Sequence, residues 1–332
     1  MLLKLIIMKK QFLTLIILVL CFTKLVQSQN YKTEETSFKS DSLTLFADIY
    51  TPNKTGKKIG IALIQGSGDS GDRTNLWSQS FAKILAENGY YVLLPDKRGC
   101  GKSEGNWKNS SFFDLSLDAV ASVHHLKNKM NLDAVGVMGL SQGGFIAPIA
   151  ASSDTSIQFV IDIVGAAVTL EEQIIHEVTN SAMKKGLEPN EIKEVLELHV
   201  LMKQYAFDQK WESLEKRFAE LDSSSWSEFA NTFPSSKDIW VWNWIKLNID
   251  FNPMNYWKKV NQDVFVAYGS KDQNDNMPVY ESVYRLQKGF RLKNKENYQI
   301  KVYETGHAMY EDDRAEIRKE FIIDLLSWLE KY

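Results

Sequence analysis

Cysteine is nearly absent from this chain of 332 residues, which contains only Cys21 and Cys100. Cys21 lies in an amino-terminal segment that we expect to be removed, so one thiol remains and an internal disulfide is excluded. The five histidines also lack a zinc-ligand spacing with another histidine, a cysteine or an acid. We therefore expect a fold held together by its apolar core, with no metal and no cofactor.

An excess of positive charge is absent as well. The chain has 39 lysines and arginines against 42 acidic residues, and four of the lysines precede residue 30. Binding to nucleic acid depends on a basic surface that neutralises phosphates, so we expect no nucleic-acid partner. The sequence shows no low-complexity tract and no internal repeat, and its length suits one domain with an insertion.

The amino terminus resembles a secretory signal peptide. Lys9 and Lys10 precede an apolar stretch at residues 12–22, and Val26-Gln27-Ser28 provides a small-residue cleavage site. We expect cleavage after Ser28, so that residues 1–28 are removed and the protein is exported to a periplasm or an extracellular space.

Two alternatives for this segment stay open. The apolar stretch is shorter than the span of about 20 residues that crosses a membrane, but residues 1–7 are also apolar and could extend it into an uncleaved anchor. That anchor would be the chain's only membrane contact. A lipid anchor on Cys21 is less favoured, because Leu20 precedes it where a lipoprotein signal has a small residue.

The most informative stretch is Gly139-Leu140-Ser141-Gln142-Gly143. It follows the apolar residues 134–138 and precedes Phe145-Ile146-Ala147, so the pattern predicts a strand, a sharp turn and a helix. A glycine two residues to either side of Ser141 removes the Cβ atoms that would collide in such a turn. The hydroxyl of Ser141 would then be held out as a nucleophile, although a serine here could also merely cap the helix.

Two further polar side chains follow predicted strands. Residues 264–269 lead to Asp272, and residues 298–303 lead to His307. The order serine, aspartate, histidine, each at the end of a parallel strand, resembles the α/β-hydrolase fold, a mostly parallel sheet flanked by helices. The resemblance implies that Ser141 attacks, His307 acts as its base and Asp272 orients His307.

Other residues compete for these roles. Asp275 is the substitute for Asp272, which we favour because it follows its strand sooner. The remaining histidines fall in helix-like stretches away from strand ends; they are His124, His125, His176 and His199.

By the same resemblance, the backbone N–H groups of Ser67 and Gln142 form an oxyanion hole. Ser67 belongs to the run Gln65-Gly66-Ser67-Gly68, which follows the apolar residues 59–64. Many relatives of this fold have histidine where this chain has Gln65. The oxyanion hole uses main-chain N–H groups, so glutamine at position 65 leaves the chemistry possible. The replacement of histidine by glutamine affects instead the conformation of the loop.

The same glycines fit a rival pattern. Residues 66–71 match the Gly-x-Gly-x-x-Gly fingerprint of dinucleotide sites, with Asp96 as the ribose-binding acid. Asp69 and Asp72 would then place negative charge beside a pyrophosphate, and the turn at Ser141 would be unexplained. Gly101-Lys102-Ser103 imitates the end of a phosphate-binding loop, but Asp96 stands where its first glycine is required.

The predicted hydrolase core has two parts, residues 29–165 and 258–332. Residues 166–257 interrupt it, and we expect them to form a helical cap with helices near residues 171–186, 189–207 and 211–221. Aromatic residues concentrate there and would either pack the cap or contact an apolar substrate; they are Trp226, Phe229, Phe233, Trp240, Trp242, Trp244 and Trp257.

The sequence therefore predicts a secreted serine hydrolase, and specifically a carboxylesterase that cleaves small or medium acyl esters through an acyl-enzyme on Ser141. The expected partner is a small ester-like molecule. An aminopeptidase, an acyl-peptidase or a thioesterase could use the same triad. Acids in the cap that hold a substrate ammonium would favour the aminopeptidase, and the candidates are Glu171, Glu172 and Glu177. From another class, a catalytically silent binding module could have kept the scaffold.

Overall fold

The computed structural model describes residues 30–54, 57–311 and 316–332. The predicted signal peptide at residues 1–28 lies outside these ranges. Among the described helices, none combines the length and the apolar character needed to span a bilayer.

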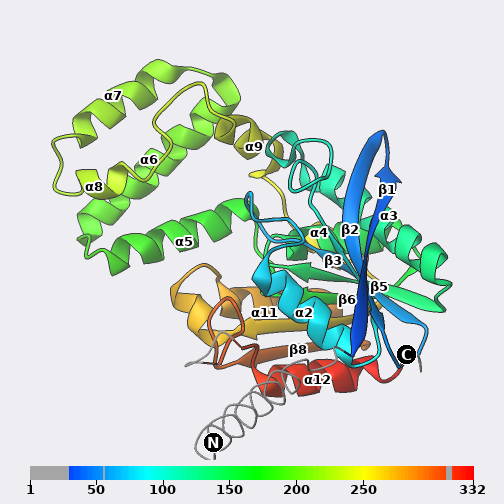
Figure 1. Ribbon diagram of the computed structural model, residues 1–332. Coiled ribbons are helices and arrows are strands. Elements are labelled where there is room, and N and C mark those ends of the chain that lie inside the picture. The colour runs from blue at the N-terminus through cyan, green and yellow to red at the C-terminus, as the bar shows by residue number, and fades with distance from the viewer. Residues whose placement is uncertain (1–29, 55–56, 312–315) are drawn as a thin grey trace, which may run out of the picture.

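An eight-stranded sheet forms the centre of the molecule, in the order β1-β2-β4-β3-β5-β6-β7-β8 (Figure 1). Neighbours from β4 to β8 are parallel, which confirms the predicted fold class, whereas β2 is antiparallel to both β1 and β4. The strands are β1 (Tyr31–Ser40), β2 (Leu43–Pro52), β3 (Ile59–Ile64), β4 (Tyr91–Pro95), β5 (Ala134–Leu140), β6 (Ile157–Ile163), β7 (Asp263–Gly269) and β8 (Tyr298–Tyr303).

Helices cover both faces of the sheet. Apolar side chains of α3 (Phe112–Met130), α4 (Gly143–Ser153) and α11 (Val279–Leu292) form one core cluster, and those of α2 (Leu76–Glu87) and α12 (Lys319–Leu329) form the other. Alternate residues of β3 enter the two clusters, with Ala62 and Ile64 in the first and Ile61 and Leu63 in the second. Every residue of β3 is buried, as expected for a central parallel strand covered on both faces.

Six helices lie between β6 and β7. They are α5 (Leu170–Lys184), α6 (Pro189–Asp208), α7 (Trp211–Leu221), α8 (Ser227–Ala230), α9 (Val241–Asn248) and α10 (Met254–Trp257). The first three lie close to the ranges expected from the sequence. α10 packs on α4 and α11 of the core. The other five, α5 to α9, stand to one side of the sheet and are called the insertion helices below (Figure 1).

The aromatic residues of this region mainly pack. Trp242 contacts Tyr205 and Trp211 within the insertion helices, with ring centroids 5.0 and 6.4 Å away. Trp257 is fully buried against Phe290 of α11. The ring of Trp240 lies 5.0 Å from that of Trp107 in η1 (Trp107–Asn109), so it joins the insertion helices to the core.

Candidate active site

Ser141 lies on the turn between β5 and α4, in the strand, turn and helix arrangement that its sequence predicts. Its φ angle is 53°, in the left-handed region that side chains other than glycine rarely adopt. A Cβ atom at Gly139 would lie 2.4 Å from the carbonyl oxygen of Gly143, and one at Gly143 would lie 2.4 Å from that of Ile64. Only glycine therefore fits at either side of the turn, and the strained conformation exposes the serine hydroxyl.

The structure brings Ser141, His307 and Asp272 together. Nε2 of His307 lies 2.9 Å from Oγ of Ser141, and Nδ1 lies 2.6 Å from Oδ2 of Asp272. Asp272 follows β7 and is buried, and His307 follows β8. The N–H of Asn276 donates to the second carboxylate oxygen of Asp272 at 3.2 Å. A buried carboxylate against Nδ1 leaves Nε2 free to take a proton from Ser141.

The competing residues have other partners. Asp275 pairs with Lys184 of α5 rather than with His307. The other histidines contact Ser156 and Asp154 (His124), Thr36 (His125), Asn180 (His176) and Glu171 (His199).

Ser67 and Gln142, which the sequence predicts as oxyanion donors, both lie beside Ser141. A Cβ atom at Gly66 would lie 3.7 Å from Cβ of Ser141, so the loop after β3 packs directly on the nucleophile. In the part of the chain that the structure describes, the N–H groups of Ser67 and Gln142 donate to no backbone acceptor. Gln142 also precedes the first turn of α4, where the helix dipole favours negative charge.

A cleft of about 170 Å³ opens beside Ser141 and His307. Its walls come from the loop after β3 and from the start of α2, and the other lining residues are Gln65, Gly66, Ser67, Ser70, Gly71, Asn75, Trp77 and Ser78. Sequence reasoning missed Trp77 and Asn75, which belong to no motif, and Ser70, which is a variable position of the Gly-x-Gly-x-x-Gly pattern. The aromatic residues singled out in the cap are not part of this wall.

Gln65, which replaces the usual histidine, holds the loop in place. Its buried amide nitrogen donates to the carbonyl oxygens of Asp72 and Pro95, each at 3.0 Å. Its amide oxygen accepts from the hydroxyl of Ser78 in α2 at 2.6 Å. One side chain thus ties the loop to itself, to the end of β4 and to α2.

The acids in and near the dinucleotide-like pattern are engaged within the protein. Asp96 is buried and accepts from the backbone N–H groups of Arg73 and Lys102 at 2.8 and 2.9 Å. Asp69 accepts from the indole of Trp107 and pairs with Lys108. Asp96 therefore joins two loops and is closed to a ribose.

Of the three candidate acids in α5, Glu177 alone has no partner among the described residues. Glu171 pairs with Lys203, and Glu172 pairs with Arg285. Within the described residues, no hydrogen bond or ion pair involves Glu177. Its side chain is open to solvent, yet the surrounding protein raises its pKa, while nearby His307 lowers it. Glu177 is thus an unpaired carboxyl within electrostatic range of the triad.

Comparison with known proteins extends these observations. A family model described as X-Pro dipeptidyl-peptidase (S15 family) matches residues 41–295. Comparison with curated protein sequences finds no match.

Solved structures with a similar fold include an esterase of Pyrococcus furiosus, with 15% identity, a TM-score of 0.59 and coverage of 92% of this chain and 94% of that one. A proline iminopeptidase of Mycobacterium smegmatis has 14% identity and a TM-score of 0.57, with coverage of 90% and 98%. An acylaminoacyl peptidase of Pyrococcus horikoshii has 16% identity and a TM-score of 0.58, with coverage of 94% and 42%. At these identities the likeness concerns the fold. Because the family model matches more than half of the sequence, the chain belongs to the X-Pro dipeptidyl-peptidase (S15) family of serine hydrolases with the α/β-hydrolase fold.

Proposed function

We propose that this protein is a carboxylesterase that hydrolyses small or medium acyl esters through an acyl-enzyme on Ser141. The observation that carries the proposal is the continuous chain of hydrogen bonds from Ser141 through His307 to Asp272. At its Ser141 end, this series of hydrogen bonds lies beside the backbone N–H groups of Ser67 and Gln142. Neither N–H group has a backbone acceptor among the described residues.

In the first half of the reaction, Oγ of Ser141 attacks the ester carbonyl while Nε2 of His307 takes the hydroxyl proton. The carbonyl oxygen becomes an oxyanion, which the N–H groups of Ser67 and Gln142 receive. Each such donor contributes about 2.7–4 kcal/mol to the stability of the transition state. His307 then gives its proton to the leaving alcohol, and Asp272 stabilises the imidazolium in between.

In the second half, water attacks the acyl-enzyme and His307 takes its proton. The proton returns to Oγ of Ser141 as the acid departs, so the enzyme is regenerated. Apart from the attacking water, every group in these steps is a side chain or a backbone N–H of this chain.

The size of the cleft supports short substrates. At about 170 Å³ it is smaller than the pockets of roughly 300–1,000 Å³ that hold drug-sized ligands. Its lining combines hydroxyl and amide groups with the single large ring of Trp77. We therefore expect short acyl chains to react fastest.

Glu177 favours a second candidate, hydrolysis of peptides with a free amino terminus. An unpaired carboxyl near His307 could hold a substrate ammonium, and the family to which the chain belongs is described as a peptidase family. Amide and ester hydrolysis use the same triad, so the two functions differ in the leaving group and in the group that Glu177 would bind.

One experiment separates these functions. The chain from Gln29 onward would be offered p-nitrophenyl acetate, butyrate and octanoate, and aminoacyl and prolyl p-nitroanilides with free or acetylated amino groups. Turnover of the esters alone supports the carboxylesterase. Preference for free amines that disappears in Glu177→Gln, but not in the exposed control Glu212→Gln, supports the peptidase.

A further control tests whether the protein is an enzyme at all. A fluorophosphonate probe should label the wild type and not Ser141→Ala. A folded wild type that neither reacts with the probe nor turns over any substrate would favour the silent binding module.

Two expectations from the sequence complete the proposal. The insertion helices would act as a cap, because Asn180 and Lys184 of α5 bind the segment that carries Asp272, through the backbone of Gln273 and through Asp275. Export would depend on residues 1–28, and mass spectrometry of the protein recovered outside the cytoplasm would test cleavage after Ser28.

A further inference from the structure

Lys97 lies behind the site and contacts both halves of the oxyanion hole. It is the second residue after β4, and its side chain is buried. Its ammonium donates to the carbonyl oxygen of Gly66 and to the side-chain oxygen of Gln142, the latter at 3.3 Å. Gly66 precedes the donor N–H of Ser67, and Gln142 carries the other donor N–H.

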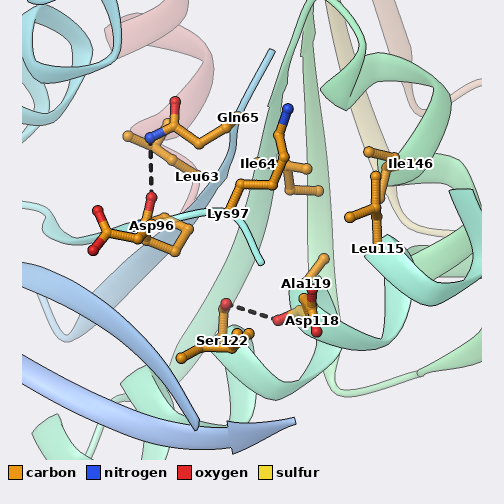
Figure 2. Close-up of a pocket in the computed structure, with 12 residues that line it drawn as sticks. Leu63, Ile64, Gln65, Asp96, Lys97, Leu115, Asp118, Ala119, Ser122 and Ile146 are labelled. Atoms are coloured by element: carbon orange, nitrogen blue, oxygen red, sulfur yellow. Dashed lines mark hydrogen bonds between the residues drawn. The ribbon is translucent and has the colours of Figure 1, made fainter. Parts of the chain in front are cut away.

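The contact with Gly66 sets the direction of the Ser67 N–H. The Gly66 carbonyl and the Ser67 N–H belong to one planar trans peptide, so they point in opposite directions. The stem of Lys97 lines a small cavity of about 30 Å³ together with Gln65 and Asp96, and its ammonium points away from Asp96 (Figure 2). Ser67 lines the catalytic cleft. A carbonyl held by Lys97 therefore fixes the N–H of Ser67 in the direction away from Lys97.

We propose that Lys97 is a positioning residue, whose ammonium holds the Gly66–Ser67 peptide and Gln142 so that both backbone N–H groups face the oxyanion. This inference rests on the proposed function, because the hole matters only if Ser141 attacks a carbonyl. The positive charge also polarises the Gly66–Ser67 peptide and so strengthens its N–H as a donor.

The surroundings of Lys97 show that it is not half of an ordinary ion pair. Asp69 is taken by Lys108 and Trp107. The carboxylates that line the same cavity are also engaged, Asp96 with Arg73 and Asp118 with Arg98.

Two uncharged groups lie near the ammonium. It lies 5.2 Å from the ring centroid of Trp107, and Cys100 is a buried thiol whose pKa burial raises. Burying an ammonium that no carboxylate neutralises is costly, and a function for the charge explains why it is kept there.

Burial lowers the pKa of Lys97 to about 8, against the weaker opposing effects of Cys100 and Asp69. The ammonium is then charged at neutral pH and loses its charge in mildly alkaline solution. The wild type should accordingly lose turnover as the pH rises through about 8.

The test compares Lys97→Met, which keeps an apolar stem, with Lys108→Met, which removes the other ammonium over the ring of Trp107. With the best ester, we expect Lys97→Met to lower kcat by about 10–100-fold, less than the 10²–10³-fold cost of removing a donor outright. KM should change by less than about threefold, since the interaction matters mainly in the transition state. Affinity for a trifluoromethyl ketone of the same acyl chain should fall in parallel with kcat, and Lys108→Met should resemble the wild type.

The pH profile provides a readout that a merely structural role would not move. The alkaline loss of kcat near pH 8 should be present in the wild type and in Lys108→Met, and absent in Lys97→Met. If Lys97→Met does not fold, Lys97→Arg keeps a charge that does not titrate in this range, and an alkaline loss of kcat that is unchanged in Lys97→Arg overturns the proposal.

Different outcomes would overturn the role of Lys97 and the proposed function. A wild type that turns over substrate, together with a Lys97→Met variant of unchanged kcat and unchanged ketone affinity, overturns the role of Lys97 alone. A wild type without turnover overturns the proposed function and the role of Lys97 together.

Discussion

The indole of Trp77 supports His307 from α2. Its Nε1 donates to the carbonyl oxygen of Ala308 at 2.9 Å, and its ring centroid lies 6.0 Å from that of His307. Trp77 also lines the cleft beside Ser141. A residue 230 positions away in the chain thus fixes the loop that carries the general base.

We predict that this contact contributes to turnover. Trp77→Phe removes the hydrogen bond and keeps a ring, and a neutral hydrogen bond contributes about 1 kcal/mol, so kcat should fall about fivefold. Trp77→Ala also empties the wall of the cleft and should cost more, with a rise in KM. Steady-state kinetics on a short p-nitrophenyl ester would measure both, and equal kcat in wild type and Trp77→Ala would disprove the idea.

A pair of matched variants tests which aspartate serves His307. Asp272→Asn should lower kcat by about 10⁴-fold, because an amide cannot hold the imidazole in the required tautomer or stabilise its charged form. Asp275→Asn removes only the ion pair with Lys184 and should stay within about twofold of the wild type. A large loss in Asp275→Asn would instead show that the anchoring of α5 matters to the site.

Gln65→Ala should lower both stability and activity. It removes three hydrogen bonds of a buried amide. The Asp72 carbonyl and the Ser78 hydroxyl keep Asn75 as a second partner, whereas the Pro95 carbonyl loses this side-chain donor, and the cost is about 1–3 kcal/mol for a buried group left unsatisfied. Denaturant unfolding would measure the loss of stability. Reduced kcat in the fraction that remains folded would show that the loop has lost its conformation, whereas an unchanged kcat would limit Gln65 to a structural role.

Asp162 predicts a dependence of stability on pH. It is fully buried at the end of β6, neither carboxylate oxygen has a well-formed hydrogen bond to the described residues, and burial raises its pKa from 3.8 to about 8. The backbone of Gly165 opposes only part of this rise.

A raised pKa means that the folded state keeps a proton which the unfolded chain releases. The bound proton of Asp162 therefore adds to the free energy of unfolding. This stabilisation is complete below about pH 4 and is lost as the pH rises to about 8. Asp162→Asn cannot lose a proton, so its stability relative to the wild type should improve steadily from pH 4 to 8. Urea unfolding at several pH values would measure this, and parallel curves for the two proteins would contradict it.

The parallel sheet and the three triad candidates can be predicted from local patterns of residues in the sequence. The parallel sheet could be predicted because apolar runs such as residues 134–138 alternate with helical segments, and the turn at Ser141 because glycine is the only residue that fits beside it. Asp272 and His307 could be found because carboxyl ends of parallel strands meet at one edge. The antiparallel β1 and β2 were not predicted, since they lie outside the motifs.

The sequence by itself therefore determined the fold class and the three residues that could form a triad, because strand periodicity and glycine turns act over a few neighbouring positions. Only the tertiary structure decided that His307 meets Asp272 rather than Asp275, and that the cap tryptophans mainly pack. It also placed Gln65, Trp77 and Lys97 around the site. These relationships depend on contacts between segments far apart in the chain, and no local pattern of residues records which distant side chain will fill a given space.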